Sequence, residues 1–127
     1  KADYQVGKIE PKKIQKEVAQ IILQQLGNGF VRMTGSKNFL RGTDEKGDHY
    51  LEFSIMRNIA KINLIRVTLN QHDYYDITFS KKRKAKHSSC YLTETMQTES
   101  DIDCDHLTET IGRVTGLAVI MPRIIFT

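Results

Sequence analysis

The stretch from residue 51 to residue 79, LEFSIMRNIAKINLIRVTLNQHDYYDITF, decides the fold class of this chain. Apolar side chains recur at every second position in three runs, residues 51–55, 65–69 and 75–79. In a strand, alternate side chains point to opposite faces, so an apolar residue at every second position predicts a strand with one buried face. Residues 70–73 are a short hairpin connection, and a shorter strand is expected at residues 30–34. Because no helical pattern separates these runs, we expect an antiparallel sheet of about four strands.

Helical patterns lie on either side of this sheet. Residues 11–26 have Pro in the first turn, and Gly27 is placed to end the helix. The apolar stripe of this helix comprises Ile14, Val18, Ile21, Ile22 and Leu26. A second helix is expected from its N-cap Ser100 to Gly116, with an apolar stripe of Cys104, Leu107, Ile111 and Val114. The predicted fold is α+β: an N-terminal helix, an antiparallel sheet of about four strands, a C-terminal helix and a short apolar tail.

The length of 127 residues is that of one ordinary domain, so we expect a single domain over residues 1–127. Residues 1–10 are expected to form a flexible arm. Residues 117–127 are expected to be either an edge strand or a tail that docks on a partner. Residues 35–48 contain glycines and several charges, and they are predicted to form a long mobile loop.

The composition is that of a globular protein, with 39% apolar and 27% charged residues. No apolar run reaches the roughly 20 residues that cross a bilayer, so we expect no membrane partner and an intracellular, soluble protein. The net charge of +4 favours polyanions without requiring one. Cys90 and Cys104 lack the spacing of a paired motif and are expected to be free thiols.

Residues 33–39, MTGSKNF, resemble at first sight a phosphate-binding loop. Such a loop needs Gly-Lys followed by Ser or Thr at the start of a helix, so that backbone amides surround the phosphates. Here the order is Gly-Ser-Lys, and the residues that follow have no helical pattern. We therefore interpret this stretch as a turn between two strands, and nucleotide hydrolysis is not expected.

Patterns for metal ions and nucleophiles are also incomplete. The alternating Asp101, Asp103 and Asp105 lack the Gly and Glu that a calcium loop requires at its sixth and twelfth places. His87 with Cys90, and Cys104 with His106, provide too few ligands for zinc and no third group to orient a catalytic base. We expect no metal, no cofactor and no catalytic residue.

The most distinctive feature is a basic run comprising Lys81, Lys82, Arg83, Lys84 and Lys86. On a hairpin, such cations meet phosphates and release counterions, so the run favours nucleic-acid binding. Lys37, Arg41 and Arg57 are expected to add phosphate contacts, and Tyr74 and Tyr91 to stack on unpaired bases. The alternatives are a solvated hairpin tip, a protected edge strand, or a surface that meets an acidic protein.

An ordered set of segments resembles a group of small uncharacterised proteins that bacteriophages and mobile elements encode. The segments are residues 33–39, 57–61, 65–69, 75–79, 87–89, Tyr91 and residues 115–117, and the opening motif of the group reads Met-Thr-Gly-Ala-Lys-Asn-Phe. The resemblance covers roughly residues 19–117, but the acidic stretch 94–105 and the chain after Leu117 depart from it. It implies a phage origin, a location in the cytoplasm of a bacterial host or in a virion, and no particular activity.

Together these observations predict a non-enzymatic bacteriophage accessory protein that binds nucleic acid through a basic hairpin. The alternative is a phage protein-protein interaction module, either a virion component or an inhibitor of a host protein. In that case the partner-binding residues are expected in the apolar tail: Ile120, Met121, Ile124, Ile125 and Phe126.

Overall fold

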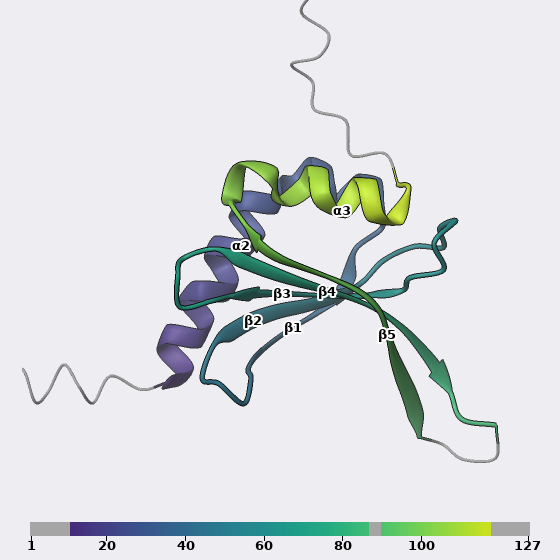
Figure 1. Cartoon of the computed structure of the whole chain (residues 1–127), viewed down its shortest axis with the longest axis horizontal. Helices are drawn as coiled ribbons and strands as arrows, with labels where there is room; N and C mark the ends of the chain where they lie inside the picture. The colour runs from purple at the N-terminus through teal and green to yellow at the C-terminus, as the bar shows by residue number, and fades with distance from the viewer. Residues whose placement is uncertain (1–10, 87–89, 118–127) are drawn as a thin grey trace, which may run out of the picture.

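The computed structural model describes residues 11–86 and 90–117, and this part of the chain has an α+β fold. Its elements are α2 (Pro11–Thr34), β1 (Lys37–Thr43), β2 (His49–Ser54), β3 (Leu64–Leu69), β4 (Tyr75–Lys84), β5 (Tyr91–Ile102), the 3-10 turn η1 (Cys104–His106) and α3 (Leu107–Thr115). Figure 1 shows both helices on one side of the sheet. The predicted class and order are therefore confirmed, although the sheet has five strands and not about four. The expected arm at residues 1–10 and the tail beyond residue 117 lie outside the described residues.

The sheet is an antiparallel meander whose strands lie in the order β1-β2-β3-β4-β5. The three predicted strand runs correspond to β2, β3 and β4. Leu51, Val67 and Ile77 are neighbours across these strands, and all three side chains are buried. The next pair along β2 and β3 is Glu52 with Arg66, and these side chains lie on the face that the helices leave uncovered. The alternation read from the sequence thus separates a covered face from an open one.

The core is formed where the two helices pack on the covered face. Its fully buried side chains include Ile22 and Phe30 of α2, Phe53 of β2, and Leu107 and Ile111 of α3. The rings of Phe30 and Phe53 meet edge to face, with centroids 5.9 Å apart and an interplanar angle of 88°. Burying an aliphatic or aromatic side chain contributes roughly 1.5–3 kcal/mol, so these residues hold the helices on the sheet.

The prediction of a strand at residues 30–34 is wrong, because α2 continues through this stretch. Gly27 adopts a non-helical conformation (φ 83°, ψ 162°), which breaks the helix where its end was predicted, but the helix then resumes up to Thr34. Leu26, Phe30 and Thr34 are buried at a spacing of four, and the Thr34 hydroxyl donates to the Phe30 carbonyl (2.8 Å). The local Phe-Val-Arg-Met-Thr sequence favours a strand, but packing on the sheet overrides that preference.

The prediction of which α2 residues form its buried stripe also needs a correction. Val18, Ile22 and Leu26 are buried as expected, whereas Ile14 and Ile21 remain 38% and 46% exposed. The helix therefore buries a narrower face than its sequence suggests.

The long mobile loop predicted at residues 35–48 is also wrong. The edge strand β1 occupies half of this stretch, and nearly all of its side chains are exposed. A tight turn then leads to β2, and one carboxylate oxygen of Asp44 accepts from the backbone amides of Lys46 and Asp48, both at 2.9 Å. Because an edge strand is held by backbone pairing and buries little, it leaves no apolar alternation in the sequence.

The second helix begins later than predicted. Ser100 is not its N-cap but lies within β5, and Asp103 caps η1 by accepting from the amides of Asp105 and His106, both at 3.1 Å. Cys104 is exposed, so it does not belong to a buried stripe. The predicted end is confirmed, because Gly116 has a left-handed conformation (φ 78°) and donates to the Gly112 carbonyl at 2.9 Å.

Candidate nucleic-acid interface

The basic run lies on a two-stranded ribbon that extends beyond the rest of the sheet. Ser80 of β4 pairs with Leu64, the first residue of β3, and β4 continues to Lys84 paired with β5. This ribbon reaches the lower right of Figure 1, away from both helices. The side chains of Lys82, Arg83 and Lys84 are exposed, as is Lys86 beyond the strand. The expected placement of these cations on a hairpin is thus what the structure shows.

The cations of the ribbon alternate between its two faces. Lys82 pairs with Thr93 and Lys84 with Tyr91, so these two lysines share one face. On that face the Lys82 ammonium lies 5.0 Å from the centre of the Tyr91 ring. Lys81 and Arg83 point to the other face, where Glu94 is the cross-strand neighbour of Lys81. Both faces of the ribbon therefore present positive charge to an anionic partner.

Two other predicted residues lie at the same end of the sheet as the ribbon. Lys37 of β1 pairs with Ser54, and pairing continues across the sheet through Leu64 to Ser80, where the ribbon starts. Arg57 follows β2 in the connection to β3 and is exposed. Lys61, at the far side of this connection, is exposed as well. Lys61 was not among the predicted residues, although a second basic residue four positions after Arg57 was a readable signal.

The remaining predicted residues are elsewhere. Arg41 is the neighbour of Leu51, in the middle of the outermost strand on the opposite edge from β5. Tyr74 precedes β4 at its other end, and its distance from Lys82 along the strand is about 26 Å at 3.3 Å per residue. Tyr75 is buried, and its hydroxyl donates to the side chain of Gln25. Of the predicted aromatic residues, only Tyr91 accompanies the basic run.

Residues 56–61, in the connection between β2 and β3, are held in one shape by hydrogen bonds. The Asn58 side chain donates to the carbonyls of Met56 and Ile62 and accepts from the Ile62 amide. Asn63 then joins this connection to the ribbon. Its side-chain nitrogen Nδ2 donates to the Lys82 carbonyl (2.8 Å), and its side-chain oxygen Oδ1 accepts from the Lys82 backbone amide (2.7 Å). The two basic segments are therefore joined by hydrogen bonds from the Asn63 side chain to the Lys82 backbone.

We define the basic end of the molecule as Lys37, Arg57, Lys61, Lys81, Lys82, Arg83, Lys84 and Lys86. Carboxylates gather at the other end, in the turns between β1 and β2 and between β3 and β4 and around the end of β5: Asp44, Glu45, Asp48, Asp73, Asp76, Asp101, Asp103 and Asp105. Lys46 is an exception at that end, and Glu94 is an exception on the ribbon. The two ends of the described structure therefore differ in the sign of their charge.

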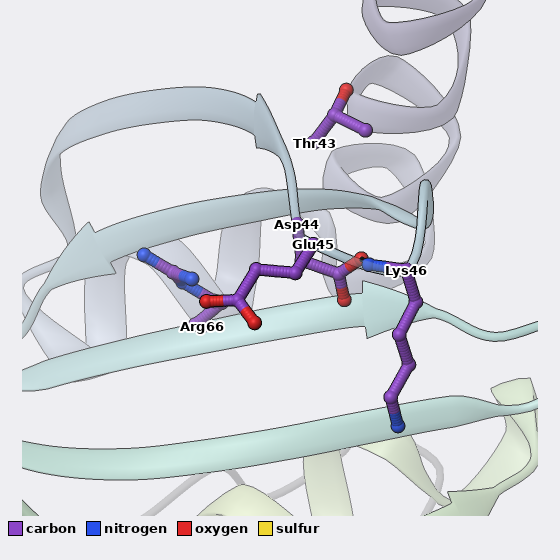
Figure 2. A pocket seen from close by; sticks show the side chains of 5 residues that line it. All are labelled: Thr43, Asp44, Glu45, Lys46 and Arg66. Atoms are coloured by element: carbon purple, nitrogen blue, oxygen red, sulfur yellow. Dashed lines mark hydrogen bonds between the residues drawn. The ribbon is translucent and has the colours of Figure 1, made fainter.

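A shallow pocket of about 350 Å³ lies beside the β1–β2 turn. Figure 2 shows the residues that line it: Thr43, Asp44, Glu45, Lys46 and Arg66. The Arg66 guanidinium is bound by Glu52 (2.8 Å) and lies 3.9 Å from the centre of the Tyr50 ring. This arginine is therefore already paired on the open face of the sheet. Among the described residues, no group of three or more His, Cys, Asp or Glu side chains is arranged to hold a metal ion.

The shifted pKa values belong to groups at the end of the molecule where the carboxylates gather. A side-chain hydrogen bond to Asp103 (2.7 Å) raises the pKa of His106, and the same bond lowers the pKa of Asp103. Burial, followed by the nearby Cys104, raises the pKa of Tyr75. The cap at η1 and the packing of β4 explain these shifts without a catalytic role.

The MTGSKNF stretch is a turn, although it joins a helix to a strand and not two strands as predicted. Thr34 ends α2, the Ser36 hydroxyl is buried against that of Thr34, and Lys37 begins β1. A phosphate-binding loop needs a helix after its lysine, so that amides and the helix dipole face the phosphates. A strand follows here, which agrees with the interpretation that this stretch does not cradle a nucleotide.

Two sets of predicted residues lie outside the described part of the chain. They are the partner-binding residues of the tail, Ile120, Met121, Ile124, Ile125 and Phe126, and residues 87–89 of the phage-protein resemblance. Within residues 11–86 and 90–117, no helix is long and apolar enough to cross a membrane. Comparison of the chain with protein-family models, curated proteins and solved structures found no match.

Proposed function

We propose that this protein binds nucleic acid through its basic end, as a non-enzymatic accessory protein of a bacteriophage. The observation that carries the proposal is the ribbon, which presents Lys82, Arg83 and Lys84 on two exposed faces while the carboxylates gather at the opposite end. A cation that meets a phosphate releases a condensed counterion, and this release drives binding that does not depend on base sequence. In this role the protein works in the cytoplasm of the bacterial host or in the virion.

The fixed geometry of the basic end supports the same function. Because Asn63 joins the connection at residues 56–61 to the ribbon, Arg57 and Lys61 keep their places relative to Lys82. Phosphates along a backbone also have fixed spacing, so a preformed set of cations loses less conformational entropy on binding than a mobile one.

The test is fluorescence anisotropy with a labelled DNA or RNA of about 20 nucleotides, measured between about 50 and 200 mM salt. The ribbon variant combines Lys82→Gln, Arg83→Gln and Lys84→Gln. The matched control combines Lys16→Gln, Arg41→Gln and Lys46→Gln, which removes the same charge from exposed residues outside the basic end. At about 0.7–0.9 per phosphate contact, the ribbon variant should lose two to three units from the slope of log K against log salt, and the control should lose none.

Equal losses in the two variants would show that net charge, and not the ribbon, governs binding. Failure of the wild type to bind below about 10 μM at 50 mM salt would overturn the proposal, since basic proteins reach weak background binding without a site. In that case a nuclease-resistant protein partner, recovered from infected cells, would support the alternative function as an interaction module.

A further inference from the structure

Ile59 is an exposed apolar side chain at the basic end. Its side chain is 88% exposed, the largest fraction among the large apolar residues that the structure describes. Isoleucine gains roughly 1.5–3 kcal/mol when it is buried, and at this position the folded chain does not recover that free energy. A single exposed apolar residue is common on protein surfaces, so its exposure alone indicates nothing. The shape of its loop and the charges beside it are what give it a function.

The loop holds Ile59 in a defined position. Asn58, the preceding residue, bonds to the backbone of Met56 and Ile62, as described above. On the other side, Ile59 lies against Gly116, where a Cβ atom added to the glycine would be only 2.7 Å from the Cγ2 atom of Ile59. Glycine at the end of α3 therefore leaves room for this isoleucine. The side chain is displayed on a fixed support, so ordering it on binding costs little entropy.

The charges beside Ile59 indicate the chemistry of its partner. Arg57 and Lys61 lie two residues before and two residues after it, both exposed, and Lys82 is connected to the same loop through Asn63. A partner for this surface must be anionic outside and apolar within. Double-stranded nucleic acid meets both requirements, since phosphates line its grooves and apolar base faces become accessible when a base step opens.

We propose that Ile59 is a wedge that enters between two base pairs of a duplex while Arg57 and Lys61 contact the flanking phosphates. This inference rests on the proposed function and makes double-stranded nucleic acid its ligand. Insertion of an apolar wedge unstacks the step and bends the duplex by about 20–90°. Flexible pyrimidine–purine steps open most easily, so the protein prefers duplexes that contain them.

The experiment uses a duplex of about 20 base pairs with 2-aminopurine beside a central TA step and a fluorophore pair at its ends. Binding is followed by anisotropy in the same titration. Wild-type protein should raise the 2-aminopurine fluorescence at least about twofold and increase energy transfer between the ends. Ile59→Ala should lose both signals and weaken binding about 3- to 10-fold, while the salt slope stays unchanged because no phosphate contact is removed.

Two further variants make the test specific to this side chain. Ile59→Thr keeps the branch at Cβ but replaces the ethyl group with a hydroxyl, and it should resemble Ile59→Ala. Leu40→Ala removes another exposed apolar side chain, 56% exposed on β1, and it should behave as wild type. Melting temperatures of all variants confirm that the fold is intact.

The outcomes separate the wedge from the proposed function. Binding with the expected salt slope but without a 2-aminopurine signal would overturn the wedge and leave the function standing. Equal effects of Ile59→Ala and Leu40→Ala would also overturn it. If the wild type binds a single strand of the same length but not the duplex, the wedge is overturned and the function stands; if it binds neither, both are overturned.

Discussion

Replacing Asn63 by Ala should loosen the ribbon without unfolding the protein. The Asn63 side chain makes two hydrogen bonds to the backbone of Lys82, at 2.8 and 2.7 Å. Asn63 immediately precedes β3, and its side chain makes the hydrogen bonds to β4 that the backbone of a longer β3 would make. In the variant, the Lys82 amide and carbonyl on this side face only water.

The magnitude follows from these two bonds. Each contributes about 0.5–1.5 kcal/mol net, and because both are at the surface the lower half of this range applies, so the total is about 1–2 kcal/mol. A change of 1.4 kcal/mol in local opening is a factor of ten, so the Lys82 amide should exchange with solvent about 5 to 30 times faster. Ile77, buried in the same strand, should keep its exchange rate.

The assay is amide hydrogen exchange of ¹⁵N-labelled protein, read by NMR at neutral pH. Asn63→Asp keeps the oxygen that accepts from the Lys82 amide and loses the donor, so it should give an intermediate rate. Binding of nucleic acid should weaken in Asn63→Ala, because the connection at residues 56–61 is then less firmly joined to the ribbon. A Lys82 rate within about twofold of wild type would show that Asn63 does not hold the ribbon, and the reasoning would be refuted.

Three other changes test the fold and the assignment of its parts. Phe53→Ala should lower the free energy of unfolding by about 3–5 kcal/mol in urea denaturation, because the ring is fully buried against Phe30; a loss below about 1 kcal/mol would contradict this packing. His106→Ala should lower the melting temperature most between about pH 4 and 6.5. The stabilising pair of His106 with Asp103 weakens as pH rises through the raised pKa of His106, and it weakens in acid as pH falls through the lowered pKa of Asp103. A difference in melting temperature between variant and wild type that grows toward about pH 9 would be inconsistent with the pair. Calorimetry should detect no binding of Mg-ATP to the wild type or to Lys37→Ala. Micromolar binding by the wild type that is lost in this variant would show that the turn after α2 is a phosphate site.

The elements predicted correctly are those that bury one face. The strands β2, β3 and β4 lie against both helices, so burial imposes an apolar period of two on their sequences. The glycines at 27 and 116 were readable because each adopts a positive φ that breaks or ends a helix. Local sequence was sufficient wherever burial or backbone conformation selected the residue.

The elements that sequence reasoning missed have a different physical basis. Nearly all side chains of β1 and β5 are exposed, and these edge strands are held mainly by backbone pairing, which leaves no apolar pattern. The second part of α2 has residues that prefer strands, and only its packing on the sheet keeps it helical. No window of local sequence contains that information.

The candidate site was predictable only as far as it is local. The basic run was visible because its residues are adjacent in the sequence, and its hairpin position follows from the strand before it. The grouping of Lys37 and Arg57 with the ribbon depends on strand register, and so does the separation of Tyr74 from it. Ile59 was overlooked because sequence does not reveal how far a loop side chain projects.

The most direct test of the central claim, that nucleic acid binds at the basic end, is NMR chemical-shift mapping. A ¹⁵N-labelled sample is titrated with a short duplex at about 50 mM salt, where phosphate contacts are strong. Binding at the basic end should change the shifts of the backbone amides of Lys81–Lys84, Tyr91, Arg57 and Lys61, and of none in the turn at residues 44–48. Changes concentrated instead on α2 around Ile14 and Ile21, or an unchanged spectrum at saturating duplex, would contradict it.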